Sequence, residues 1–425
     1  MGFISFGGPA GQIAILHQEL VVRRRWISDR RFLHALNYCM VLPGPEAQQL
    51  ATYLGWLLHG TRGGLVAGSL FVLPSFFILI ALSWAYVVWE STPVVAALFY
   101  GIKPVVVAIV AAAAWRIGAR ACSTLFLAGI AALSFALTAL GGVPFPAILV
   151  MAGLLGWAVG RLLPEQIGQS QVHETAVNGA GDEFVIGDSS PSPDHTGTVP
   201  LRWLPTLLIG ACLWLLVLGV IVYAGGGPEG TLASMALFFS KAAVLTVGGA
   251  YAVLPYVFDA AVEQYGWLAP GQVLDGLALG ETTPGPLIMV VTFIGFVGAW
   301  SQPPFGTEHL LAGALVAAAV VTFCTFLPSF LFILIGGPLV ERTREELRVN
   351  APLRAITAAV VGVIGNLALV LGKHTLILGS DGRVDWVAAA IVVFTFFDLL
   401  RWRVGVPLLV SMGALIGLGV YVLPS

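Results

Sequence analysis

The chain has little charge and little sulfur. Only 10% of its 425 residues are charged and its net charge is −2, whereas soluble domains carry about 25% charged residues. So small a net charge favours neither a nucleic-acid partner nor an acidic one. The four cysteines show neither CxxC nor Cys/His spacing, so we expect them to pack in apolar surroundings and expect no metal site.

Catalytic motifs are missing as well. The sequence has no HExxH, GxSxG or Walker-type constellation, each of which would place a specific reactive group. We therefore expect neither an enzyme nor a bound cofactor. No cleavable signal peptide is visible ahead of the first Gly-Gly pair.

Apolar residues dominate what is present. They make up 58% of the chain, and the mean hydropathy is +0.93. Because backbone groups in lipid must pair within their own segment, the expected fold class is an all-α polytopic membrane protein. The stretches long enough to cross a bilayer as helices are 64–89, 95–115, 121–140, 144–160, 203–223, 309–336, 354–372, 384–400 and 405–422.

Internal repeats organise these stretches. FGGPAGQIAIL is echoed by VGGAYAVLPYV, and LPGPEA (42–47) by TPGPLI (283–288), both at an offset of 241 residues. FVLPSFFILI is matched by TFLPSFLFILI at an offset of 254. Collinear blocks at nearly constant spacing mark a duplication. We therefore interpret the chain as two homologous halves that differ by one insertion of 13 residues.

Loop charges indicate how the halves are oriented, since Lys and Arg collect in cytoplasmic loops. The loop 21–31 is strongly basic, whereas its counterpart 259–272 has no Lys or Arg. Farther along the pattern reverses, because 84–93 has no basic residue and its counterpart 341–354 has four arginines. Equivalent loops are therefore expected on opposite sides of the membrane. This predicts two inverted-topology repeats with broken or re-entrant helices.

The predicted domain boundaries follow the repeats. They give an N-terminal repeat at 1–160, a flexible cytoplasmic linker at 161–202, a topology-inverting transmembrane helix at 203–230 and a C-terminal repeat at 231–425. The linker is polar, acidic and bears Gly, Ser and Pro, so its histidines are expected to be solvated rather than to bind a metal.

Pro-Gly-Pro and Gly-Gly sequences interrupt the apolar segments at equivalent places. Proline lacks an N–H and glycine accepts turns, so each Pro-Gly-Pro should end one half-helix and begin another. Such motifs also occur as packing kinks, but their duplication favours a midplane site in which half-helix N-termini hold an anion. The candidate substrate ligands are Gly7, Gly8, Gln12, Gly44, Pro45, Gln48, Lys103, Lys241, Gly248, Gly249, Thr283, Gly285 and Pro286.

Ionisable residues in apolar surroundings sharpen this hypothesis, because each is costly unless it is paired or wet. Lys103 and Lys241 are expected to hold the anion, while Glu46 or Glu281 carries a coupling proton. The alternative is structural: the lysines pair with the glutamates, Glu46 caps the dipole of its own helix, and the remaining side chains snorkel.

At these residues the sequence resembles a known family. FGGPAGQIAILHQELV, RRWISDRRFLHALNYCMVLPGPEAQQLATYLGW, SKAAVLTVGGAYAVLPYV and LGETTPGPLIMVVTFIGF are similar to blocks of the chromate transporter (CHR) family of prokaryotes, in its long form with two fused halves. The resemblance implies a multi-pass protein of the prokaryotic plasma (inner) membrane. It also implies a secondary transporter that exports chromate and confers chromate resistance, for which we expect alternating access at a midplane site.

The residues leave other functions open. Sulfate has the shape and charge of chromate, so a sulfate or general oxyanion transporter, working inward or outward, is one alternative, and an anion channel is another. A proton is the expected coupling ion, the lipid bilayer is the expected environment, and homo-oligomerisation is left open. The first repeat has almost no apolar residues before its Gly-Gly pair, where the second has about a dozen, which predicts a shortened first half-helix.

Overall fold

The computed structural model describes residues 2, 8–163, 184–187, 203–224, 227–342, 351–378, 383–402 and 404–422. Within these ranges, six helices are long and apolar enough to cross a membrane, and four shorter apolar helices accompany them. The described strands are one antiparallel pair, β1 (Ile377–Leu378) and β2 (Arg383–Val384). The fold class predicted from hydropathy is therefore confirmed. The residues before the first Gly-Gly pair, where the sequence predicts a shortened half-helix, lie largely outside the described residues.

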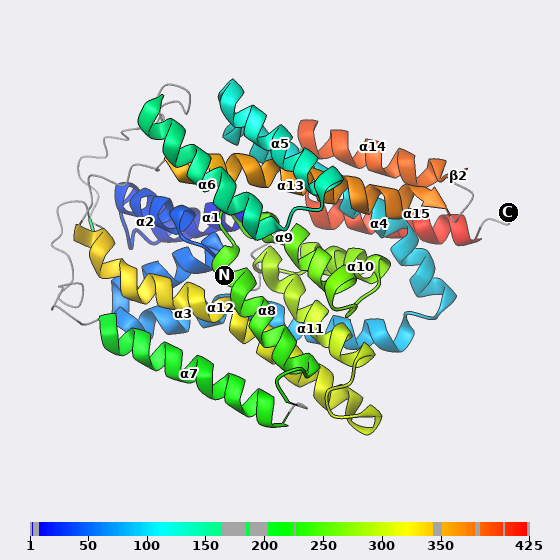
Figure 1. The fold of residues 1–425 in the computed structure, drawn as a ribbon, viewed down its shortest axis with the longest axis horizontal. Coiled ribbons are helices and arrows are strands. Elements are labelled where there is room, and N and C mark those ends of the chain that lie inside the picture. The colour runs from blue at the N-terminus through cyan, green and yellow to red at the C-terminus, as the bar shows by residue number, and fades with distance from the viewer. Residues whose placement is uncertain are drawn as a thin grey trace.

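The first half and the helix that follows it contain eight helical elements among the described residues. They are α1 (Gly8–His17), the π-helix η1 (Gln18–Arg23), α2 (Asp29–Val41), α3 (Glu46–Trp89), α4 (Pro93–Ala121), α5 (Leu125–Gly141), α6 (Phe145–Leu162) and α7 (Trp203–Ala224). α7 lies along one edge of the molecule, beside α12 of the second half (Figure 1).

The second half adds a helix at its start and then follows the same order. Its elements are α8 (Thr231–Leu245), α9 (Ala250–Asp259), the π-helix η4 (Ala260–Gln264), α10 (Pro270–Thr282), the 3-10 helix η5 (Leu287–Met289), α11 (Val290–Ser301), the 3-10 helix η6 (Thr307–His309), α12 (Leu310–Arg342), α13 (Ala351–Leu376), α14 (Trp386–Arg401) and α15 (Val406–Val422).

Helix boundaries repeat with the offsets found in the sequence. α2 and α10 have equal length and lie 241 residues apart at both ends. α1 followed by η1 corresponds to α9 followed by η4. Non-helical dihedral angles at His59 and Gly60 divide α3 into a short first arm and a long second arm. These arms correspond to α11 and α12, and α4, α5 and α6 correspond to α13, α14 and α15.

Each Pro-Gly-Pro sequence forms the tip of a helical hairpin. In the second half, α10 and α11 run antiparallel, with Gly276 facing Phe293 and Gly280 facing Val290. In the first half, α2 packs on α3 in the corresponding way. Proline is the N-cap residue of the helix that leaves each tip, where its missing N–H costs no hydrogen bond. α2 lies to the left of the molecular centre and α10 to the right (Figure 1).

The two tips pack reciprocally against the opposite halves. Gly44 has φ +128° and Gly285 has φ +117°, a region that favours glycine. A Cβ atom at Gly44 would clash with Oγ of Ser329, and one at Gly285 would clash with Oγ of Ser75. Ser75 also donates a hydrogen bond to the carbonyl oxygen of Pro284. Each Pro-Gly-Pro tip of one repeat therefore meets the Leu-Pro-Ser block of the other.

The long helices are exchanged between the halves. α4 packs on α14 and α15 of the second half, while its counterpart α13 packs on α5 and α6 of the first. α4 and α13 also contact each other, with Gly118 facing Val361 and Gly372 facing Val107. Val107 precedes Gly118 along α4, but its partner Gly372 follows Val361 along α13, so the two helices are antiparallel. At the offset of 254 residues Gly118 corresponds to Gly372 and Val107 to Val361, so the two contacts are equivalent and the packing is reciprocal.

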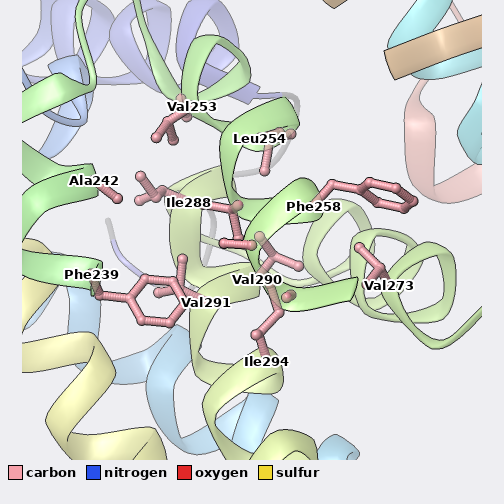
Figure 2. Close-up of a cluster of buried hydrophobic side chains, with 14 of the residues drawn as sticks. Phe239, Ala242, Val253, Leu254, Phe258, Val273, Ile288, Val290, Val291 and Ile294 are labelled. Atoms are coloured by element: carbon pink, nitrogen blue, oxygen red, sulfur yellow. The ribbon is translucent and has the colours of Figure 1, made fainter. Parts of the chain in front are cut away.

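Apolar packing holds the second hairpin in place. Phe239 and Ala242 of α8, with Val253, Leu254 and Phe258 of α9, surround its tip (Figure 2). From the hairpin itself Val273, Ile288, Val290, Val291 and Ile294 point into the same cluster, and all ten of these side chains are buried. A broken helix is tolerated at membrane depth when protein surrounds it, as it does here.

Part of the predicted flexible linker departs from that expectation. Ile186 N–H donates to the carbonyl of Trp26 at 3.0 Å, and Ser28 N–H donates to the carbonyl of Ile186 at 3.1 Å. The side chain of Ile186 is buried in a cluster that includes Leu20 and Phe32. Residues 184–187 are therefore docked on the loop between η1 and α2, through backbone pairing that hydropathy does not reveal.

Gly285→Ala tests the packing of the second tip. The new methyl group would strain the backbone and clash with Ser75, so we expect the free energy of unfolding to fall by about 2–4 kcal/mol. Gly306→Ala is the matched control, because Gly306 has φ +80° but open space around it, and should cost about 1 kcal/mol. SDS titration of the purified protein measures both, and equal losses would contradict the packing argument.

Candidate functional site

The helix breaks of the two halves meet. Nε2 of Gln12 in α1 donates a hydrogen bond to the carbonyl oxygen of Gly285 at the second tip. The N–H of Gly44 at the first tip donates to the carbonyl of Thr246, at 2.7 Å, just after α8 ends. Each tip is thereby bonded to the other half close to that half's Gly-Gly break. The region formed by Gln12, Gly44, Thr246, Gly249 and Gly285 is termed the break site.

Glycine sets the geometry of the second Gly-Gly break. Gly248 and Gly249 have φ +88° and +96°, so a side chain at either position would strain the backbone. Gly249 is the N-cap residue of α9. The first N–H groups of α9 consequently have no partner within the helix and carry partial positive charge. This helix end is suited to attract an anion.

A carboxylate from each hairpin lies beside the first turn of α9. Glu46, the first residue of α3, has its Oε1 atom 3.4 Å from the position that a Cβ at Gly249 would take. Glu281, near the end of α10, accepts a hydrogen bond from the hydroxyl of Tyr251 at 2.6 Å. Both glutamates are partly buried.

The remaining predicted ligands near the tips are partly engaged already. Gln48 is buried and its Nε2 donates to Oγ1 of Thr52 within the same helix, at 3.0 Å. Its Oε1 atom has no partner among the residues that the structure describes. Thr283 is buried and its hydroxyl donates back to the end of α10. Gly8 begins α1 with φ +68°, whereas Gly7 lies outside the described residues. Pro45 and Pro286 are the N-cap residues of the helices that leave the tips.

The two predicted lysines lie away from these contacts. Lys103 in α4 forms an ion pair with Asp275 of α10, with 3.4 Å between Nζ and Oδ1. Asp275 precedes Thr283 by about two helical turns, or roughly 12 Å along the axis. Lys241 is exposed on α8 and forms no ion pair within the described part of the chain. The break site and its immediate neighbours are therefore backbone groups, the Gln12 amide and the carboxylates of Glu46 and Glu281.

Several residues that contact the tips, Lys103 or Glu281 were not predicted from the sequence. Lys103 and Lys241 were predicted because they are ionisable residues in apolar surroundings. Asp275 meets the same criterion, but its segment 270–282 was not among the predicted apolar spans. Ser75 and Ser329 lie in the duplicated Leu-Pro-Ser block, and that duplication was their signal. Tyr251 lies two residues after the second Gly-Gly pair. Nothing in its local sequence indicates that it meets Glu281.

The chemistry that the break site offers is noncovalent. Helix N-termini and the Gln12 amide can donate hydrogen bonds to a compact oxyanion, and Glu46 and Glu281 can gain or lose protons. Among the described residues, no group of three His, Cys, Asp or Glu is placed to hold a metal ion. The arrangement is therefore suited to reversible anion binding.

Comparison with known proteins assigns a family. The model of the family described as Chromate transporter matches residues 1–157 and 233–418, one region in each half. A chromate transport protein of Pseudomonas aeruginosa is 33% identical over 377 residues, covering 88% of this chain and 79% of that protein. One of Cupriavidus metallidurans is 29% identical over 423 residues, covering 99% and 91%. A probable chromate transport protein of Synechococcus elongatus is 27% identical, covering 88% and 83%. No solved structure matches the chain.

The resemblance recognised in the sequence is thus confirmed over both halves. The family matches leave out the linker and include both Pro-Gly-Pro tips and the second Gly-Gly break. With its membrane-spanning helices, the chain belongs to the chromate transporter family, as a multi-pass protein of the plasma membrane.

Proposed function

We propose that the protein is a secondary transporter that exports chromate from the cytoplasm and thereby confers chromate resistance. Membership of the chromate transporter family supports the substrate. The observation that carries the mechanism is the meeting of helix breaks from both halves, Gln12 with Gly285 and Gly44 with Thr246. Chromate is a tetrahedral dianion, and converging helix N-termini can bind such an ion and release it again.

The two halves are proposed to be inverted repeats. The antiparallel, reciprocal contact of α4 with α13 supports an approximate two-fold relation between them. If both helices cross the membrane, that axis lies in the membrane plane. Between the linker, which starts at 161, and the second repeat, which starts at 231, α7 would carry the chain across the membrane once more. It corresponds to the topology-inverting helix predicted at 203–230, and an inverted second repeat requires this extra crossing. Rocking of one set of exchanged helices against the other would expose the break site alternately to each side.

Protons are proposed to drive export. Glu46 and Glu281 flank the first turn of α9 from opposite hairpins. In such an exchange, chromate would leave the cytoplasm in one half-cycle and a protonated glutamate would return to the cytoplasmic side in the other, so that the anion and the proton cross separately. The basic loop around Arg23 and Arg24 supports a cytoplasmic position for the end of η1.

Chromate flux in inside-out proteoliposomes tests the function. We expect an acidic lumen to raise the accumulation of radiolabelled chromate about tenfold over vesicles without a pH gradient, because each exported anion is exchanged for protons. A tenfold excess of sulfate should inhibit only weakly. Equal transport of sulfate, or flux only in the opposite direction, would instead indicate a general oxyanion carrier.

Cysteine labelling tests the inversion. Val22 and Glu263 occupy equivalent positions at the ends of η1 and η4, and both are exposed, whereas Trp267 is buried and unsuitable for labelling. In a background without native cysteines, Val22→Cys should react with an impermeant maleimide only from the cytoplasmic side, and Glu263→Cys only from the outside. Labelling of both from one side would contradict inverted repeats.

Glu46→Gln tests the coupling. The amide keeps the shape of the side chain but cannot exchange a proton, so we expect gradient-driven accumulation to fall at least about tenfold while chromate counterflow persists. Glu263→Gln, an exposed carboxylate replaced in the same way, should leave both measurements within about twofold. If Glu46→Gln retains gradient-driven accumulation, Glu46 does not carry the coupling proton.

A further inference from the structure

A polar cavity lies at the opposite end of α10 from the break site. Its volume is about 350 Å³, and it is bounded by the end of α3, the first turns of α4 and the first turns of α10. Gln272 and Glu90 lie at its rim, where Nε2 of Gln272 donates to Oε1 of Glu90 at 3.2 Å. Lys103 and Asp275 line its inner part. One helix, α10, therefore connects this cavity to the second tip.

The charged groups lie at different depths in the cavity. The Lys103 side chain is 30% exposed, whereas that of Asp275 is only 6% exposed. Oδ2 of Asp275 accepts a hydrogen bond from the hydroxyl of Tyr86 at 2.9 Å. Oδ1 has Lys103 as its ion-pair partner at 3.4 Å and no closer hydrogen bond within the described residues. Beyond Glu90 at the rim, an entering ion would thus meet the Lys103 ammonium group before the carboxylate of Asp275.

The ion pair is present in one half only. At the offset of 241 residues, the position of Asp275 corresponds to His34, and at 254 residues the position of Lys103 corresponds to Thr357. The hydroxyl of Thr357 donates to the carbonyl of Leu353 within its own helix. A pair required only to stabilise the shared framework would be expected in both halves. Its restriction to one half indicates a role that distinguishes the two sides of the membrane.

We propose that Lys103 is a second, weaker binding station for the transported oxyanion, and that Asp275 is the counter-ion that keeps its affinity low. This inference rests on the proposed function. A dianion in the cavity would be attracted by Lys103 and repelled by Asp275 and Glu90. Passage requires binding strong enough to draw the ion in and weak enough to let it leave. Asp275 provides that balance by neutralising the lysine when the station is empty.

Asp275→Asn separates the two contributions. The amide keeps the contact with Tyr86 but no longer neutralises Lys103, so chromate should be held more tightly and released more slowly. In proteoliposomes we expect both KM and Vmax for chromate to fall about five- to tenfold. Equilibrium dialysis of the detergent-solubilised protein should show a Kd for chromate lowered by a similar factor. Asp398→Asn is the matched control, since Asp398 is another buried carboxylate, on α14, and should leave KM and Vmax within about twofold.

Lys103→Gln alone would leave a buried carboxylate unpaired and can fail to fold. The double variant Lys103→Gln/Asp275→Asn avoids this, because neither side chain of the pair then carries a charge. It should insert and elute from size exclusion like the wild type, with a KM for chromate raised about tenfold.

The outcomes separate the station from the function itself. An unchanged KM and Kd in Asp275→Asn, or a wild-type KM in the double variant, would overturn the station. Loss of gradient-driven accumulation in Asp275→Asn with KM unchanged would overturn it too, because Asp275 would then be a proton carrier. Absence of chromate flux and binding in the wild type would refute the proposed function instead.

Discussion

A helix that breaks inside a membrane leaves backbone N–H and C=O groups that lipid cannot satisfy, and the arrangement of this protein depends on how those groups are paired. At the first tip the Gly44 N–H bonds to Thr246 of the other half, and at the second the Gly285 carbonyl receives the Gln12 amide. Each half thus satisfies backbone groups of the other. This mutual pairing gives a physical reason for the two halves to pack against each other at their breaks.

The same constraint connects two duplicated sequence blocks that have no evident relation along the chain. The glycine of each Pro-Gly-Pro tip lies against the serine of the opposite Leu-Pro-Ser block. A side chain larger than hydrogen at the tip would separate the hairpin from the long helix that supports it. Close packing at the tips and the exchange of α4 and α13 between the halves therefore belong to one arrangement, in which small residues allow helices from different repeats to approach.

The repeats share a backbone framework but not their charges. Arg25 has φ +52° and its counterpart Gly266 has φ +60°, both in the left-handed region. The two repeats therefore share this backbone angle even though it is unfavourable for arginine. By contrast, Asp275 and Lys103 correspond to His34 and Thr357. In the proposed transporter, equal frameworks would expose one site alternately to each side, whereas unequal charges would give the two routes to that site different affinities.

Composition and periodicity determined the fold class, and the repeat offsets determined which helices correspond, because hydrophobic length and helix-breaking residues act locally along the chain. The sequence also placed the helix breaks and the glutamates beside them. Only the tertiary structure decided that Lys103 pairs with Asp275 rather than with a glutamate, that Lys241 is exposed, and that residues 184–187 dock on the first half. These contacts join segments far apart in the chain, so their free energy depends on packing that no local pattern encodes.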